Sequence, residues 1–186
     1  MVGKREARSR EQLLESCLAA FVSAGSLDLS LDSLAKAVGS NKRMLIHYFG
    51  GHDNLEEMAL SLLEDRLRAR FQSGSFPART SLCSALKSLW EQATHPEARG
   101  VLLVTMDLTR RGWSGSERGR GFFEEQQRLW TDLLLELLPD PKAVESLLQL
   151  FQGAVLVYLV TGDSDRGWRA LERAASVESE LRPERQ

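Results

Sequence analysis

Leucine dominates the apolar residues of this chain, and this composition restricts the folds open to it. The 186 residues include 32 Leu but only 1 Ile, 10 Val and 6 Thr. Branching at Cβ favours strands and disfavours helices, whereas Leu is a good helix former. The sequence therefore predicts an all-α fold, in a chain long enough to bury a core without disulfides or metals.

Apolar residues recur at intervals of three and four along most of the chain, as on one face of an amphipathic helix. Together with breaks at Gly and Pro, this pattern predicts about nine helices, at residues 6–23, 31–38, 42–49, 53–72, 78–94, 96–111, 122–138, 141–162 and 165–181. We place a domain boundary after residue 52, which gives domains 1–52 and 53–186. Arg111–Gly121 contains four glycines, so we expect a mobile loop there.

The cysteine content and the apolar stretches bear on where the protein works. Cys17 and Cys83 are too few for a disulfide scaffold, which favours a reducing, cytoplasmic compartment. We expect no signal peptide, because the charged N-terminus is not followed by an apolar run. The most apolar segment, Leu147–Val160, is shorter than the roughly 20 residues of a membrane-spanning helix. We therefore expect no membrane segment and interpret this stretch as a buried interface helix.

Positive charge is concentrated near the start of the chain, although the net charge is −2. The cations at the N-terminus are Lys4, Arg5, Arg8 and Arg10. A basic arm of this kind suits contact with phosphates, and it equally suits a solvated terminus.

Residues 30–49 show the spacing of a helix-turn-helix, with two short helical patterns joined by a turn at Gly39. Ser30 and Asn41 precede the two helices as N-caps. The apolar positions Leu34, Val38, Leu45 and Phe49 are expected to pack on the first helix. This packing would leave the residues between them partly outward, namely Lys42, Arg43, Met44, His47 and Tyr48.

This motif, the helix before it, and the segment Gly-His-Asp-Asn-Leu-Glu-Glu-Met-Ala after it resemble the TetR family of bacterial transcriptional regulators. The resemblance covers residues 10–60 and implies a DNA-binding first domain and a second domain that binds an effector and dimerises. Three positions depart from the family pattern. Ile46 replaces an aromatic residue that contacts a phosphate, Ser40 replaces a Val in the turn, and His52 replaces a Lys.

Arg43 and Lys42 are the strongest candidates for contact with bases. They begin the recognition helix, where the helix dipole disfavours cations, so an anionic partner would explain both. Arginine or lysine bound to guanine is the commonest specific contact. Met44 either contacts a thymine methyl group or packs inward, and His47 either contacts DNA or is an exposed spectator.

Phosphate contacts are implied by the resemblance at Tyr48 and Ser30, and Ser30 can also act as an N-cap. His52 would bind a phosphate when its ring is protonated. The predicted DNA-binding residues are therefore Ser30, Lys42, Arg43, Met44, His47, Tyr48 and His52.

The last two helices carry an apolar stripe that, by resemblance, pairs two chains as a homodimer, although it would also suit the core of a single chain. The predicted dimer interface comprises Val144, Leu148, Phe151, Val155, Tyr158, Leu159, Trp168 and Leu171. The middle helices carry large apolar side chains that either enclose an effector or pack in the core. The predicted pocket comprises Trp90, Met106, Trp113, Phe122, Phe123 and Trp130.

The sequence does not favour catalysis. Its three His and two Cys lack metal-ligand spacing, and it has no nucleophile elbow or dinucleotide fingerprint. We therefore predict neither a metal nor a cofactor. The chain is interpreted as a repressor that binds a palindromic double-stranded DNA operator as a homodimer and releases it when a small molecule binds. The alternative is a helical protein-interaction module whose helix-turn-helix no longer reads DNA.

Overall fold

The computed structural model describes residues 2–70, 76–77 and 80–180, with side chains from residue 9 to residue 178 inside these ranges. All regular structure in these ranges is helical, which confirms the predicted all-α class. The elements are α1 (Val2–Ala24), α2 (Leu31–Ala37), α3 (Lys42–Phe49), α4 (His52–Arg70), α5 (Leu82–Thr94), a 3₁₀ turn (Pro96–Ala98), α6 (Arg99–Trp113), α7 (Glu117–Leu135), α8 (Pro141–Thr161) and α9 (Ser164–Glu180). The helix ends predicted at residues 71, 72, 78, 79 and 181 lie outside the described residues.

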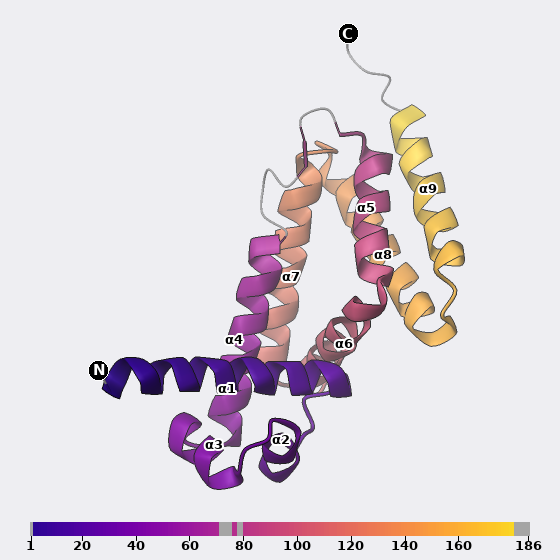
Figure 1. Ribbon diagram of the computed structural model, residues 1–186. Helices are drawn as coiled ribbons and strands as arrows, with labels where there is room; N and C mark the ends of the chain where they lie inside the picture. The colour runs from indigo at the N-terminus through magenta and orange to yellow at the C-terminus, as the bar shows by residue number, and fades with distance from the viewer. Residues whose placement is uncertain (1, 71–75, 78–79, 181–186) are drawn as a thin grey trace.

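The N-terminal helices gather at one end of an elongated molecule (Figure 1). Helix α1 lies across α4, and α2 and α3 form the tip beyond it. Helix α4 leads from this tip along α7 toward the other end, where α5, α8 and α9 pack together. The element order therefore places the two short helices of the helix-turn-helix at an exposed extremity.

Two apolar cores hold these helices together. The first joins α1, α2, α3 and α4 around Phe21 and Phe49, and it includes Val104 and Leu108 of α6 and Phe122 of α7. The second joins α5, α8, α9 and the C-terminal part of α7. The cores therefore do not divide at residue 52, because α4 and parts of α6 and α7 share the core of the preceding helices.

The glycine-rich segment Arg111–Gly121 is mostly helical, so the prediction of a mobile loop was wrong. Helix α6 continues to Trp113 and α7 begins at Glu117. A Cβ atom added to Gly119 would lie 2.5 Å from the Leu108 carbonyl oxygen and 2.5 Å from the Gly112 nitrogen. Glycine at this position therefore permits the backbones of α6 and α7 to cross in close contact.

Helix α8 is longer than the apolar stretch that indicated it. Asp140 caps it by accepting the N–H groups of Lys142 and Ala143, and Pro141 occupies its first turn, so the helix spans Pro141–Thr161. Within the described part of the chain it is the one helix long and apolar enough to cross a membrane, judged by length and composition. Its apolar residues contribute to the second core. Only 33% of its most apolar stretch is buried inside the chain, however.

Substituting Gly119→Ala is expected to destabilise the chain by roughly 1–3 kcal/mol, because the new methyl group meets backbone on two sides and cannot rotate away. Gly121→Ala is the matched control, since nothing lies within 4 Å of its added Cβ atom. Because Gly121 lies inside a helix, Gly121→Ala should raise the free energy of unfolding by about 0.5–1 kcal/mol. Urea unfolding would measure both, and equal effects of the two variants would contradict the close crossing.

Candidate nucleic-acid interface

The two helices of the predicted helix-turn-helix form and are capped as their sequence indicates. The Ser30 hydroxyl accepts the Ser33 N–H at 3.2 Å, and the Asn41 side chain accepts the Met44 N–H at 2.9 Å. Gly39 adopts φ +63° in the turn, a conformation that side chains with a Cβ atom rarely adopt. Sequence-local contacts therefore define α2, the turn and α3.

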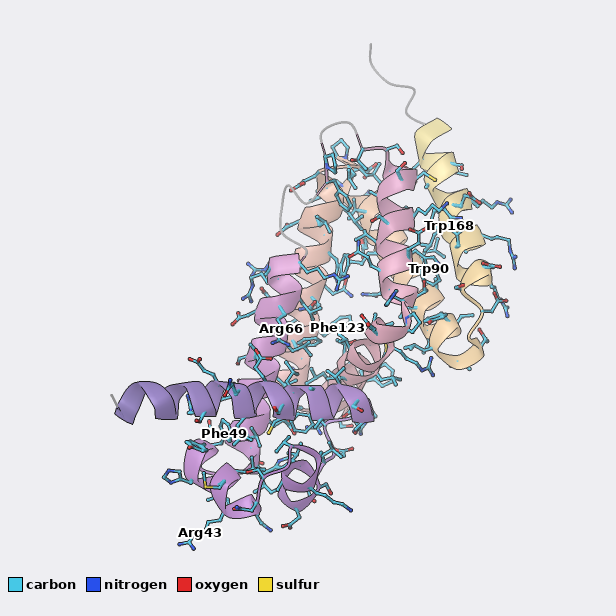
Figure 2. The ribbon with its side chains drawn as sticks, viewed as in Figure 1. Arg43, Phe49, Arg66, Trp90, Phe123 and Trp168 are labelled. Atoms are coloured by element: carbon cyan, nitrogen blue, oxygen red, sulfur yellow. The ribbon has the colours of Figure 1, made fainter. Side chains whose placement is uncertain are left out.

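Helix α3 is anchored by Leu45 and Phe49, which are buried in the first core. Its other side is exposed, and Arg43 projects from it away from the molecule (Figure 2). Among the described residues Arg43 has no hydrogen-bond or ion-pair partner, whereas the Lys42 Nζ atom lies 2.8 Å from an oxygen of Asp32. Arg43 is thus the cation of α3 that is free to meet an external anion.

The apolar and aromatic residues of α3 differ in exposure. Met44 is 36% exposed, so it does not pack into the core. Ile46 is 43% exposed. Tyr48 is half-buried and contacts the edge of the exposed His47 ring at a centroid distance of 5.1 Å. His47 therefore remains accessible to a partner, and Tyr48 presents only part of its ring.

Arg10 links α1 to α3 and α4 and is not part of a free basic arm. Its Nε atom donates to the Tyr48 carbonyl at 3.2 Å, and a second nitrogen donates to the Met58 sulfur at 3.1 Å. Its guanidinium also lies 5.7 Å from the centroid of the Phe49 ring. The side chains of Lys4, Arg5 and Arg8 lie outside the described residues.

His52 is held inside the chain. Its Nε2 atom lies 2.7 Å from the Leu29 carbonyl oxygen and therefore donates to it, while Nδ1 lies 3.6 Å from an Asp53 oxygen. Both His52 and Ser30 line an open groove of about 610 Å³ between the tip and helices α6 and α7. The ring is thus engaged by the connector before α2, which weakens the expectation that it meets a phosphate.

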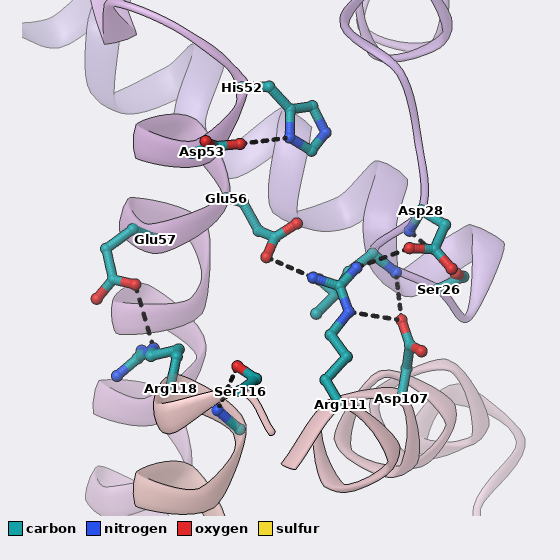
Figure 3. A network of polar contacts seen from close by, with 12 residues as sticks. Ser26, Asp28, His52, Asp53, Glu56, Glu57, Asp107, Arg111, Ser116 and Arg118 are labelled. Carbon is teal, nitrogen blue, oxygen red and sulfur yellow. Dashed lines mark hydrogen bonds and ion pairs between the residues drawn. The ribbon is translucent and has the colours of Figure 1, made fainter. Parts of the chain in front are cut away.

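A polar cluster joins α6 to α4 and to the connector before α2 (Figure 3). The Arg111 guanidinium lies 2.7 Å from Glu56 of α4, 2.8 Å from Asp28 before α2, and 3.7 Å from Asp107 of α6. Asp107 also accepts the backbone N–H of Leu27 at 3.1 Å. We call these four charged residues the Arg111 cluster. The sequence analysis did not predict this cluster. The feature that could have indicated it is Asp107, the one acidic residue in the apolar run 101–108, followed by Arg110 and Arg111.

Two carboxylates of the Arg111 cluster, Glu56 and Asp107, have pKa values shifted in opposite directions. Burial raises the pKa of Glu56, and Arg111 only partly offsets this effect. Burial also acts to raise the pKa of Asp107, but the Leu27 N–H and the neighbouring Arg110 and Arg111 outweigh it. The pKa of Asp107 therefore lies below its ordinary value, and the folded state favours its charged form.

The predicted effector-pocket residues do not surround one cavity. Trp90 is 3% exposed and donates to the Ser164 carbonyl at 3.1 Å, while Trp130 stacks on Phe151 in the second core. Met106 packs against the same core, but Phe122 belongs to the first core. Trp113 and Phe123 are exposed, by 85% and 40%. Helical periodicity could not separate these environments, because all six residues are large and apolar.

The predicted dimer residues turn largely toward the core of their own chain. The residues buried within one chain are Val144, Leu148, Val155, Leu159 and Leu171, which favours the alternative that these five complete the core of a single chain. Phe151, Tyr158 and Trp168 are half-buried, and the Tyr158 hydroxyl donates to the Thr94 carbonyl at 2.9 Å. The large apolar residues exposed on α8 and α9 are Leu156, Val160 and Val177.

Two solved structures have a fold similar to that of this chain. A putative TetR-family transcriptional regulator from Rhodococcus sp. superimposes with a TM-score of 0.69 at 19% identity, over 90% of this chain and 97% of that one. A TetR-family transcriptional regulator from Streptomyces coelicolor gives a TM-score of 0.74 at 20% identity, over 94% of this chain and 83% of that one. The chain has the TetR-family fold. No family model and no curated protein matches the sequence.

The three departures from the TetR-family sequence pattern leave the TetR-family fold intact. Ser40 keeps the turn closed, because its backbone N–H donates to the Ala35 carbonyl at 2.9 Å. Ile46 lies on the exposed side of α3, where it does not disturb the core, and His52 is tied to Leu29. The departures therefore change the surface chemistry of the tip and not its packing.

Substituting Arg43→Ala is expected to cost about 1–3 kcal/mol of specific DNA binding and to relax the preference at one base pair. The reason is that Arg43 is exposed and has no partner within the described chain. Lys42→Ala is the comparison, because Asp32 already engages that charge. Fluorescence anisotropy with single-base variants of a bound duplex would measure both effects, and unchanged affinity with unchanged preference would refute the assignment to Arg43.

Substituting Asp107→Asn should lower the free energy of unfolding by about 1–2 kcal/mol at pH 7, since the variant loses charge-assisted bonds to Leu27 and Arg110. Because the folded pKa is depressed, the stabilisation by Asp107 is complete above the unfolded pKa of roughly 3.9. It disappears as the pH falls through the folded value. The variant should therefore lose less stability between pH 5 and pH 2.

Urea unfolding at each pH would measure this difference. Asp132→Asn is the control, because Asp132 is exposed on α7, away from the Arg111 cluster. A pH dependence of Asp107→Asn identical to that of the unaltered chain would show that Asp107 does not stabilise the fold through its charge.

Proposed function

We propose that the chain is a DNA-binding transcriptional regulator of the TetR family that acts as a homodimer. The observation that carries this proposal is the state of α3. Its inner side is fixed by Leu45 and Phe49, while Arg43 projects unpaired into solvent at its first turn. A rigid short helix with a free arginine at its start is suited to the major groove, where arginine binds guanine O6 and N7.

The exposed apolar side chains of α8 and α9 support the homodimer. Leu156 is 54% exposed, Val160 is 78% exposed and Val177 is 47% exposed. Leu156 and Val160 lie on α8, which also has a core face, and Val177 lies on α9, so a second copy of the α8–α9 pair would shield apolar surface from water. A two-fold dimer of this kind would place two α3 helices on two half-sites of a palindromic operator.

Release of DNA by a small-molecule effector is proposed to act through α4 and α6. Both helices belong to the first core, and the Arg111 cluster ties them to the connector before α2. A ligand that favours a different arrangement of α6 would therefore shift the tip and change the separation of the two α3 helices. The effector would increase the population of a form that fits the operator less well.

Selection from randomised duplex DNA at about 150 mM salt tests the proposed function. Sequencing of the bound fraction should reveal a motif with two-fold symmetry, because each chain of the dimer would read one half-site. Analytical ultracentrifugation of the recovered complex should show two chains per palindrome. Val160→Asp should dissociate the dimer, whereas Trp113→Ser, which alters an exposed apolar residue elsewhere, should not.

Failure of the selection would distinguish the alternatives. If the protein retained DNA only at low salt and no sequence were enriched, non-specific attraction to phosphates would explain the binding. If unfolding and refolding to remove a bound ligand did not restore enrichment, the proposed function would be wrong. The helical protein-interaction module would then account better for the exposed α3.

A further inference from the structure

The exposed side of α3 contains an apolar residue beside its free cation. Ile46 follows Arg43 by three positions and Lys42 by four, so the three side chains are neighbours on the helix surface. Ile46 is 43% exposed, although Leu45 and Phe49 on the same short helix are fully buried. Nothing in the part of the chain that the structure describes therefore explains an apolar side chain at this position.

The chemistry of Ile46 limits what it can contact on a duplex. It has no donor or acceptor, so it forms no hydrogen bond to a phosphate or to a polar base edge. In the major groove the C5-methyl group of thymine is the apolar feature of the base pairs, and apolar side chains recognise it. Arg43 beside it supplies the charge that complements the phosphates and the donors that match guanine.

We propose that Ile46 is a specificity-determining residue that contacts the methyl group of a thymine next to the base pair read by Arg43. This inference rests on the proposed DNA binding and adds a base to the recognition site. The position would then select a sequence, whereas a polar residue there would contact the phosphate backbone and bind every sequence alike.

The assignment is tested with the full-length protein and the duplex recovered by selection. Each thymine is replaced in turn, in both half-sites, by deoxyuridine, which lacks only the methyl group. At one thymine the replacement should weaken binding by about fourfold per half-site, the factor expected for one buried methyl group. Ile46→Ala should weaken binding to the thymine duplex and should not respond to the replacement at that position.

Met44→Ala provides the comparison with a second candidate for contact with a thymine, because Met44 lies on the same helix with a similar exposure of 36%. It should retain the response to deoxyuridine at the assigned position. Thermal unfolding should show that Ile46→Ala and Met44→Ala both fold, since neither side chain is buried in the core. The slope of log affinity against log salt should be unchanged in Ile46→Ala, because no phosphate contact is lost.

The outcomes separate this inference from the proposed function. If no duplex is enriched, the proposed function itself fails. If a duplex is bound but no thymine methyl group matters, or if Ile46→Ala keeps the same response to deoxyuridine, the assignment of Ile46 is overturned. Equal losses on thymine and deoxyuridine duplexes in Ile46→Ala would instead place the side chain against the sugars of the backbone.

Discussion

The guanidinium of Arg111 connects three segments that no continuous helix joins. It sits in the last turn of α6, where the helix dipole favours a cation, and faces carboxylates from α4, α6 and the connector before α2. The planar arginine fork fixes the directions of its partners more strictly than a lysine would. The position of α4 and of the connector before α2 relative to α6 therefore depends on this side chain, in addition to the apolar packing.

The ion pairs of Arg111 connect segments that belong to the first of the two apolar cores, so the arrangement of the cores determines what these ion pairs hold together. The first core extends from the helix-turn-helix into α4, α6 and α7, and the second holds α5, α8 and α9. Helix α7 contributes to both, and the close crossing at Gly112 and Gly119 packs it against α6. The paired helices α6 and α7 therefore link the second core to the core that contains α3.

Information that is local in sequence predicted much of the fold. Leucine content and periodicity indicated the helices, and Ser30, Asn41 and Asp140 cap helices as serine, asparagine and aspartate commonly do. The glycine-rich segment was misinterpreted, because glycine in a close helix crossing and glycine in a loop are identical in sequence. Only the three-dimensional structure reveals that the partner of Gly119 is the backbone of α6.

The candidate site was predicted less completely, because several of its contacts join residues that are distant in sequence. The outward residues of α3 follow from helical periodicity, which correctly placed Leu45 and Phe49 inside. The contacts of Arg10, His52 and Arg111 join residues far apart in the chain, so no local pattern indicates them. Periodicity likewise identified the apolar side of α8, but it could not separate residues facing α9 from those facing outward.

The scarcity of isoleucine gives the chain a built-in spectroscopic probe. Its single isoleucine, Ile46, lies exposed on α3. Selective ¹³C labelling of isoleucine δ1 methyl groups would therefore produce one resonance per chain, located on the surface expected to meet DNA. In a symmetric dimer the two copies would share that resonance, and a duplex that engaged only one half-site would split it.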